Sequence, residues 1–160
     1  MLEKYGNFWE IKADVRCITT NGALRRNGNA IMGKGMAFQA REKCKAQNYN
    51  LEAVLGKMIK NYGNHVFYLG NNLFSFPTKH QWRENSDIKL IERSSHEIIN
   101  LLRDLDSSEW KRILLTRPGC GNGGLEWKDV KPVIQNILDD RFIIVDNSYQ
   151  GYVSTFKRYR

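Results

Sequence analysis

The chain has 160 residues, of which 41% are hydrophobic, which is enough to form one domain with a real core and excludes a disordered segment. Its formal net charge is +8, with the basic residues spread along the chain rather than gathered in a block. A phosphate-rich partner, nucleic acid included, is compatible with this charge, but many basic domains bind neither. Charge alone therefore leaves the partner open.

The three cysteines, Cys17, Cys44 and Cys120, are odd in number and lack CxxC spacing. This argues against a disulfide framework and a zinc site, so we expect a reducing compartment, the cytoplasm, and no metal or other cofactor. The first residues do not resemble a signal peptide, and no later stretch resembles a membrane span. We therefore expect no membrane partner, and a monomer.

The first half of the chain alternates between strand and helix patterns. Short strands are expected at 8–11 and 15–19, where β-branched and aromatic residues gather, followed by a polar loop at 21–29. Small residues recur at helical spacing from Met36 to Cys44. A second helical pattern begins at Leu51 and ends near Gly63.

Two further strands, at 65–69 and 73–76, are expected to form a hairpin through a turn at 70–72. Pro77 is expected to close the second strand. A long helical pattern then begins at Asp87.

Apolar strands are expected at 112–116 and 141–145, with a helix between them that starts near Asp129 and carries Pro132 in its first turn. The alternation predicts one α/β domain over residues 1–160, a sandwich with a mixed sheet.

Two glycine-rich loops indicate a phosphate ligand. The stretch from Gly119 to Gly124 has four glycines in six positions between a strand and a helix, and Gly33-Lys34-Gly35 opens another helix. Backbone N–H groups in such loops bind phosphate, and glycine has no Cβ to hold a ligand away. Because ligands of open α/β sheets collect at the carboxyl ends of the strands, the two loops should meet and suit a diphosphate. Neither matches a P-loop or a dinucleotide fingerprint, and a plain turn is the alternative for each.

A third motif completes a set that resembles a known family. The motifs are Met32-Gly33-Lys34-Gly35-Met36-Ala37, Phe76-Pro77-Thr78-Lys79-x-x-Trp82-Arg83 and Gly119-Cys120-Gly121-Asn122-Gly123-Gly124-Leu125-x-Trp127. In order and spacing, over nearly the whole chain, they resemble the macrodomain family, in the branch of the DarG antitoxin and the terminal ADP-ribose protein glycohydrolase. The resemblance implies a three-layer α/β/α fold with a mixed central sheet, and ADP-ribose or an ADP-ribosylated substrate as ligand.

The resemblance also implies a reaction. The DarG branch removes ADP-ribose from thymidine bases in DNA, so the chain is expected to be an ADP-ribosylglycohydrolase with single-stranded DNA as a candidate partner. Two alternatives stay open: an ADP-ribose 1''-phosphate phosphatase, and a module that binds ADP-ribose or a related nucleotide without turnover.

Matching motif to motif assigns the expected ligand-binding residues. Asn7 stands where macrodomains usually have an aspartate at the adenine edge, and Tyr149 is where an aromatic often covers adenine, a docked tail residue being the alternative. Thr78 and Trp82 are expected to position a strand end. The two phosphate-side loops are formed by Met32, Gly33, Lys34 and Gly35, and by Gly119, Cys120, Gly121, Asn122 and Gly123.

Lys79 is the expected catalytic residue, because the lysine of this motif is catalytic in the family branch. In a partly desolvated pocket beside Arg83 or Lys34, its charged form would be disfavoured and the amine would be available as a nucleophile. If charged, it would instead stabilise the departing base or the opened sugar. A phosphate-clamping or surface lysine is the structural alternative.

Asn21 is the second expected catalytic residue, because the ribose-binding asparagine of macrodomains also follows a strand. Its amide can donate to and accept from adjacent ribose hydroxyls. Residues 22–29 are inserted relative to the DarG pattern, so Asn27 or Asn29 is an alternative ribose contact. The arginines of this loop would contact DNA phosphates, contact a terminal phosphate of the ligand, or remain solvated.

One expected absence concerns Gly123, which aligns with an aspartate of the terminal protein glycohydrolase. A carboxylate general acid is therefore missing from this loop, which argues against a protein-linked ester as the substrate.

Overall fold

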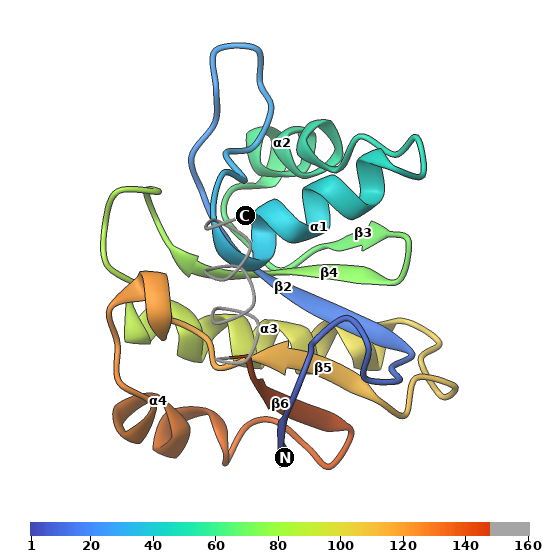
Figure 1. Cartoon of the computed structure of the whole chain (residues 1–160), viewed down its shortest axis with the longest axis vertical. Helices are drawn as coiled ribbons and strands as arrows, with labels where there is room; N and C mark the ends of the chain where they lie inside the picture. Colours follow the sequence, from blue (N-terminus) through green and yellow to red (C-terminus); the bar gives the residue numbers. More distant parts are fainter. Residues whose placement is uncertain (148–160) are drawn as a thin grey trace, which may run out of the picture.

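The computed structural model describes residues 1–147; residues 148–160, which include Tyr149, lie outside the described part. Figure 1 shows the course of the chain. The strands are β1 (Leu2–Tyr5), β2 (Val15–Asn21), β3 (Tyr68–Gly70), β4 (Leu73–Lys79), β5 (Ile113–Thr116) and β6 (Phe142–Asp146). The helices are α1 (Gly35–Lys45), α2 (Leu51–Tyr62), α3 (Ile88–Asp104) and α4 (Trp127–Ile134), and a short 3-10 turn, η1 (Gly121–Gly123), precedes α4.

The strands form one sheet in the order β1-β6-β5-β2-β4-β3. Neighbouring strands run parallel except β3 and β4, which are antiparallel and joined by the expected turn. In that turn Asn71 and Asn72 have φ angles of 55° and 57°, a conformation that asparagine adopts more readily than most residues. The predicted mixed sheet is confirmed.

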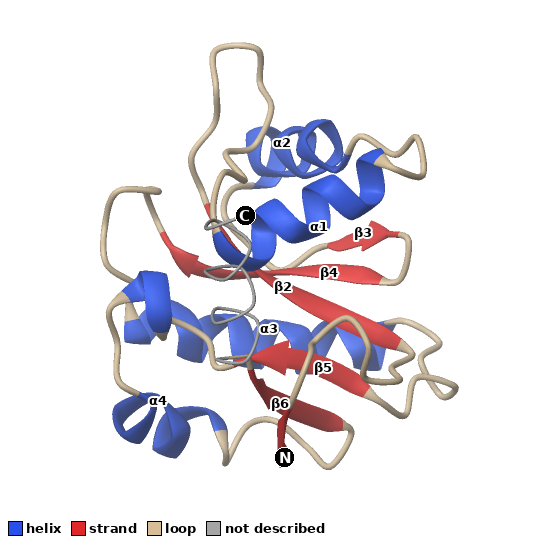
Figure 2. Ribbon diagram, in the orientation of Figure 1, coloured by secondary structure: helices blue, strands red, loops and turns tan. Residues whose placement is uncertain are grey.

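Two helices cover each face of the sheet, which gives three layers (Figure 2). Side chains alternate along the strands, so Ile18 and Leu114 pack with α1 and α2, whereas Cys17, Ile113 and Leu115 pack with α3 and α4. Because β5 and β6 are buried on both faces, their sequences are continuous apolar runs. The α/β/α fold predicted from the sequence is confirmed.

The prediction of a strand at 8–11 is wrong, because these residues form a turn after β1. The Asn7 carbonyl oxygen accepts the Ile11 N–H at 3.1 Å, which closes the turn. The Arg16 guanidinium donates to the carbonyl oxygens of Phe8 and Ile11 at 3.1 and 2.6 Å. Phe8 is fully buried, so its aromatic ring serves core packing rather than a strand.

Pro77 does not close its strand, because β4 continues to Lys79. Pro77 pairs with Thr20 of β2, whereas the antiparallel pairing with β3 is confined to Leu73 and Phe74. At Pro77 the strand therefore has β2 on one side only, and a proline is tolerated where no second ladder needs its N–H.

Two other boundaries differ from expectation. The strand expected at 65–69 is reduced to β3, residues 68–70. Helix α4 begins at Trp127 rather than near Asp129, so Pro132 is its sixth residue and lies beyond the first turn. The helix is only eight residues long, in keeping with the helix-breaking effect of an interior proline.

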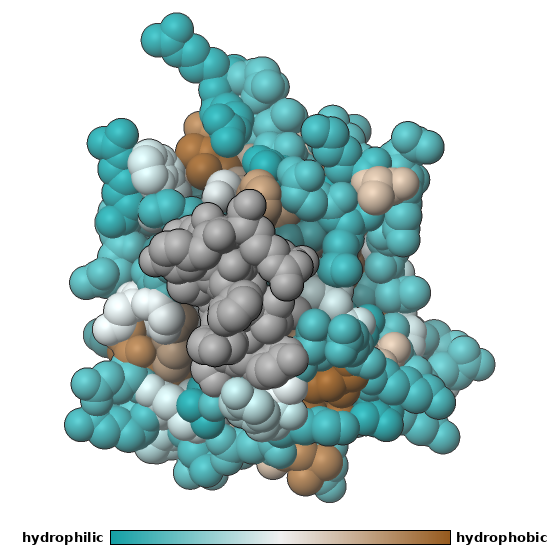
Figure 3. Space-filling view, viewed as in Figure 1, coloured by the Kyte–Doolittle hydropathy of each residue, from teal (hydrophilic) through white to brown (hydrophobic). Residues whose placement is uncertain are grey.

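The polar loop after β2, residues 22–30, is docked on α2. The Ala30 N–H donates to the carbonyl oxygen of Glu52 at 3.0 Å. Gly56 of α2 leaves room for the loop backbone, since a Cβ at this position would lie 2.0 Å from the Gly28 carbonyl oxygen. The tip projects beyond α2 and is hydrophilic (Figure 3).

We expect Gly56→Ala to destabilise the protein, although alanine ordinarily favours a helix by about 1 kcal/mol. The added methyl group must displace the Gly28 carbonyl, and overpacking of this kind costs about 1–3 kcal/mol. Urea unfolding measures the net change. Lys57→Ala, at an exposed position of the same helix, is the control; an unchanged stability of Gly56→Ala would contradict the docking of the loop.

Candidate active site

The two expected catalytic residues lie opposite each other at the carboxyl ends of neighbouring parallel strands. Asn21 ends β2 and Lys79 ends β4, and their Cα atoms are partners in the β2–β4 register. Immediately beyond them, the Gly22 N–H donates to the His80 carbonyl oxygen at 3.1 Å. The sheet therefore holds both side chains at one edge.

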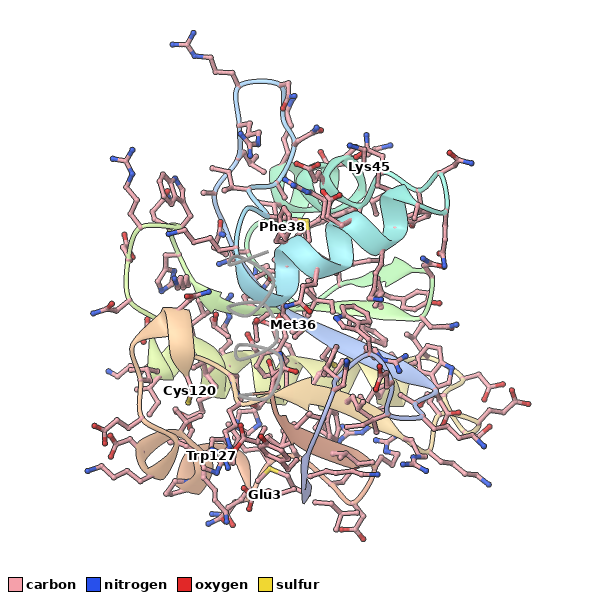
Figure 4. The ribbon with its side chains drawn as sticks, in the orientation of Figure 1. Glu3, Met36, Phe38, Lys45, Cys120 and Trp127 are labelled. Carbon is pink, nitrogen blue, oxygen red and sulfur yellow. The ribbon has the colours of Figure 1, made fainter. Side chains whose placement is uncertain are left out.

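The Lys79 side chain reaches the loop that follows β5. Its Nζ donates a hydrogen bond to the Asn122 carbonyl oxygen at 3.2 Å. The start of α1 lies against the same loop, because a Cβ on Gly35 would be 3.1 Å from Nδ2 of Asn122. In Figure 4, Met36 marks the start of α1 and Cys120 marks the loop after β5. The three sequence motifs thus meet at one place, as predicted.

The loop at 119–124 requires glycine for its conformation. Gly119, Gly121 and Gly124 have φ angles of 80°, 77° and 77°, which side chains other than hydrogen disfavour. The turn η1 exposes Gly121 and Asn122. The first N–H groups of a helical turn have no partner within it, so those of η1 would be available to an anionic ligand.

Ser86, just before α3, supports this loop from within the protein. Its N–H donates to the Gly123 carbonyl oxygen at 2.8 Å, and a Cβ on Gly123 would lie 2.2 Å from Ser86 Oγ. The hydroxyl is buried and has no hydrogen-bond partner among the described residues. Gly123 is thus needed for the close packing of the loop on Ser86.

Two hydrogen bonds hold the backbone of β4 around Lys79, and a third supports the donor of one of them. The Lys79 carbonyl oxygen accepts from Nδ2 of Asn64 at 2.9 Å, and Arg93 donates to the carbonyl oxygen of Asn64. The Thr78 carbonyl oxygen accepts the Asp87 N–H at 2.9 Å, and the Thr78 side chain is buried. The end of β4 is therefore fixed between α2 and α3. Sequence reasoning missed Asn64, which no motif marks.

Asn21 also closes the base of the loop at 22–30. Its Nδ2 donates to the Ile31 carbonyl oxygen at 3.0 Å, and its Oδ1 accepts the Ala23 N–H at 2.9 Å. One N–H and one acceptor lone pair of the amide remain for a ligand. Asn27 and Asn29 lie further along the loop, where Oδ1 of Asn27 accepts the Asn29 N–H at 3.0 Å. Of the three asparagines, only Asn21 is paired with Lys79.

The remaining expected residues surround this centre in different ways. Met32 is 1% exposed and belongs to the core, whereas Gly33 and Lys34 are exposed before α1. Asn7 follows β1, and its Oδ1 accepts the Trp9 N–H at 2.9 Å. Tyr149 lies outside the described residues, so its expected contact with adenine stays a prediction.

Cys120 is a half-buried thiol on the glycine loop. Burial raises the pKa of this thiol, against the opposing effect of the Arg117 charge. The neutral thiol is a poor nucleophile at neutral pH. Within residues 1–147, no cluster of three His, Cys, Asp or Glu side chains is arranged to hold a metal ion. No helix in that part has the length and apolar character needed to cross a membrane.

Several known proteins are similar to this chain in sequence or in fold. No family model matches the chain. A curated relative from Thermus aquaticus, named DNA ADP-ribosyl glycohydrolase, is 28% identical over 144 residues, which cover 84% of this chain and 36% of that protein. The solved macrodomain of Thermus aquaticus DarG is 26% identical, with a TM-score of 0.67 over 90% of this chain and 97% of that one. Thermosipho africanus DarTG, solved in complex with ADP-ribose, is 21% identical with a TM-score of 0.69 over 91% of this chain and 41% of that one.

The chain has the macrodomain fold. It resembles the DarG macrodomains in fold, and it spans about a third of the length of the curated relative it matches. The macrodomain arrangement explains why three motifs far apart in the sequence converge: each follows or precedes an element at the carboxyl edge of the same sheet.

The close packing of the glycine loop predicts different effects of alanine at two glycines of the candidate site. Gly123→Ala should lower the free energy of unfolding by about 1–3 kcal/mol, because the methyl group collides with Ser86. Gly33→Ala should change it by less than about 0.5 kcal/mol, since a Cβ there meets no atom within 4 Å. Chemical denaturation of both variants tests this; equal stabilities would contradict the packing of Ser86 under the loop.

Proposed function

We propose that this macrodomain hydrolyses the N-glycosidic bond between ADP-ribose and a nucleobase in DNA. The observation that carries the proposal is the hydrogen bond from Lys79 Nζ to the Asn122 carbonyl oxygen, beside Asn21. It joins a candidate catalytic amine to a candidate phosphate loop. The name of the Thermus aquaticus relative and the ADP-ribose bound to Thermosipho africanus DarTG support the choice of ligand and reaction.

In this proposal the diphosphate lies between the two glycine loops. Residues 33–35 and 121–123 would offer backbone N–H groups and short side chains to the phosphate oxygens. The distal ribose would then extend toward the ends of β2 and β4, where Asn21 would bind its hydroxyls. Asn7 and Tyr149 would contact adenine at the opposite end of the ligand.

The reaction breaks the bond between C1'' of the distal ribose and the base nitrogen. Water supplies a hydroxyl group to C1'' and a proton to the released base. Lys79 would act in one of two ways: as an amine that attacks C1'' and is later released by water, or as an ammonium that stabilises the charge on the departing base. Borohydride trapping followed by mass spectrometry distinguishes them, because only the first route gives a covalent adduct on Lys79.

Lys79→Ala should abolish turnover while leaving ADP-ribose binding mostly intact, because the side chain is placed for chemistry at one end of the ligand. We expect a loss of about 100-fold or more in the rate at which ADP-ribosylated single-stranded DNA is cleared, measured on gels. Lys57→Ala, an exposed lysine on α2, is the matched control. Full activity of Lys79→Ala would refute the catalytic role.

Gly33→Glu should have the opposite effect. Position 33 is exposed, and a Cβ there meets no atom within 4 Å, so the variant should fold. The glutamate would place a carboxylate close to the diphosphate. We expect ADP-ribose affinity to fall at least about 10-fold, since like charges brought together cost several kcal/mol. Calorimetric titration measures this, with Gly33→Ala as the uncharged control. If the wild-type protein fails to bind ADP-ribose, the proposal is wrong as a whole.

The same assays distinguish the other two functions. Release of phosphate from ADP-ribose 1''-phosphate, without action on modified DNA, would identify a phosphatase. Tight ADP-ribose binding without turnover of either substrate would identify a binding module.

A further inference from the structure

Two loops leave the candidate active site side by side. One, residues 22–30, follows Asn21, and the other, residues 80–86, follows Lys79. They are joined at their bases by the hydrogen bond from the Gly22 N–H to the His80 carbonyl oxygen. Figure 1 shows both loops extending away from the sheet at this edge. Anything long that is attached to the distal ribose must pass them.

The first loop presents arginines on a firm support. An antiparallel bridge between Leu24 and Ala30 closes it, and the Arg25 N–H donates to the Asn29 carbonyl oxygen at 2.8 Å. The side chains of Arg25 and Arg26 are exposed at the tip. Among the described residues, Arg25 lies 4.0 Å from a carboxylate oxygen of α2, whereas Arg26 makes no ion pair.

The second loop presents an aromatic ring. Trp82 is 42% exposed, and the Arg83 guanidinium stacks over its ring at 4.6 Å from the centroid. The two ends of the loop are held together, because Nε2 of His80, its first residue, lies 2.9 Å from a carboxylate oxygen of Asp87, the N-cap residue of α3. An exposed tryptophan backed by an arginine is a flat, cationic surface on which an unpaired base can stack.

The charge around this edge suits a polyanion. Arg26, Arg83 and Lys34 are exposed there, and the Asp87 carboxylate is engaged by His80. Glu84 is the remaining acidic side chain of the second loop. The balance is therefore positive, as phosphate binding requires.

We infer that these two loops bind the DNA strand that carries the ADP-ribosylated base. Trp82 and Arg83 stack on a base of a single strand, and Arg25 and Arg26 bind its phosphates. This inference rests on the proposed function for the identity of the strand, but it concerns a surface that does not contact ADP-ribose itself. The surface explains how a small cleft would act on a modified base within a polymer.

Fluorescence anisotropy of the full chain with an unmodified, labelled single strand of about 10 nucleotides, within the usual site size of such proteins, tests the inference. Trp82→Ala should weaken binding of the strand about 5- to 100-fold, whereas Trp82→Phe, which keeps an aromatic ring, should retain most of the wild-type affinity. Arg25→Ala/Arg26→Ala should weaken binding and flatten the dependence of log affinity on log salt by about 1.4, the value for two lost contacts to a single strand. Arg103→Ala/Lys111→Ala removes equal charge from exposed positions at the opposite edge of the sheet and should have no comparable effect.

Equal affinities of the loop variants and the wild type, or equal losses in the charge-matched control, would overturn the inference. Calorimetry with ADP-ribose, expected to be unchanged in all loop variants, shows that they are folded. Failure of the proposed function is recognised separately: the wild type would then bind the strand through Trp82 and yet clear no ADP-ribose from it. If the loops act as inferred, the variants lose turnover on the modified strand but keep it on ADP-ribosylated thymidine.

Discussion

The parallel pairing of β2 with β4 determines where the candidate catalytic groups lie. Asn21 and Lys79 are partners in that register, so the amide and the amine leave the sheet at the same height. Alternating core residues such as Cys17 and Ile18, which pack on opposite faces, fix the regular part of this register. The register then shifts between Thr20 and Asn21, and this irregularity at the strand end pairs Asn21 with Lys79. The position of the two candidate side chains therefore depends on core packing along the strands and on the irregularity that follows it.

The second requirement is that pairs of segments pack so closely that only glycine, which has no Cβ, fits at the contact. Gly123 allows the glycine loop at 119–124 to lie on Ser86, Gly35 allows α1 to start beside Asn122, and Gly56 lets the loop at 22–30 dock on α2. The first two bring sequence motifs together, and the third supports the loop that carries Arg25 and Arg26. Glycine lowers helix stability by about 1 kcal/mol relative to alanine, so Gly56 weakens α2 locally while it allows the tertiary contact with the loop.

Much of the fold was predictable because its strongest signals are local. The helix from Asp87 and the turn at 70–72 have capping and turn residues that act within a few positions. The strand expected at 8–11 failed because Phe8 is apolar for reasons of core packing, which involve residues distant in the sequence. Pro77 misled for a similar reason: whether a proline ends a strand depends on a neighbouring strand that the local sequence does not reveal.

The candidate site divides in the same way. Glycine spacing marked the two loops, because their backbone conformation requires glycine. Lys79 was singled out by the family resemblance of its motif. Asn64 left no such mark, since its role is to hold a carbonyl oxygen 15 positions later through tertiary packing. Near the N-terminus, the sequence favoured Asn21 and left Asn27 and Asn29 as alternative ribose contacts. The strand register pairs only Asn21 of the three with Lys79.

The groups around Lys79 also limit the chemistry that the candidate site can support. The glycine loop offers a neutral thiol at Cys120 and carries no carboxylate from Gly119 to Gly124. The carbonyl oxygen of Asn122 accepts from Lys79 Nζ, an interaction that holds the side chain toward the loop. Asn122 also lies against the start of α1, because a Cβ on Gly35 would be 3.1 Å from its Nδ2. One residue of the glycine loop therefore contacts both the end of β4 and the start of α1. A change in the position of Asn122 would alter the candidate catalytic side chain and the neighbouring glycine loop together.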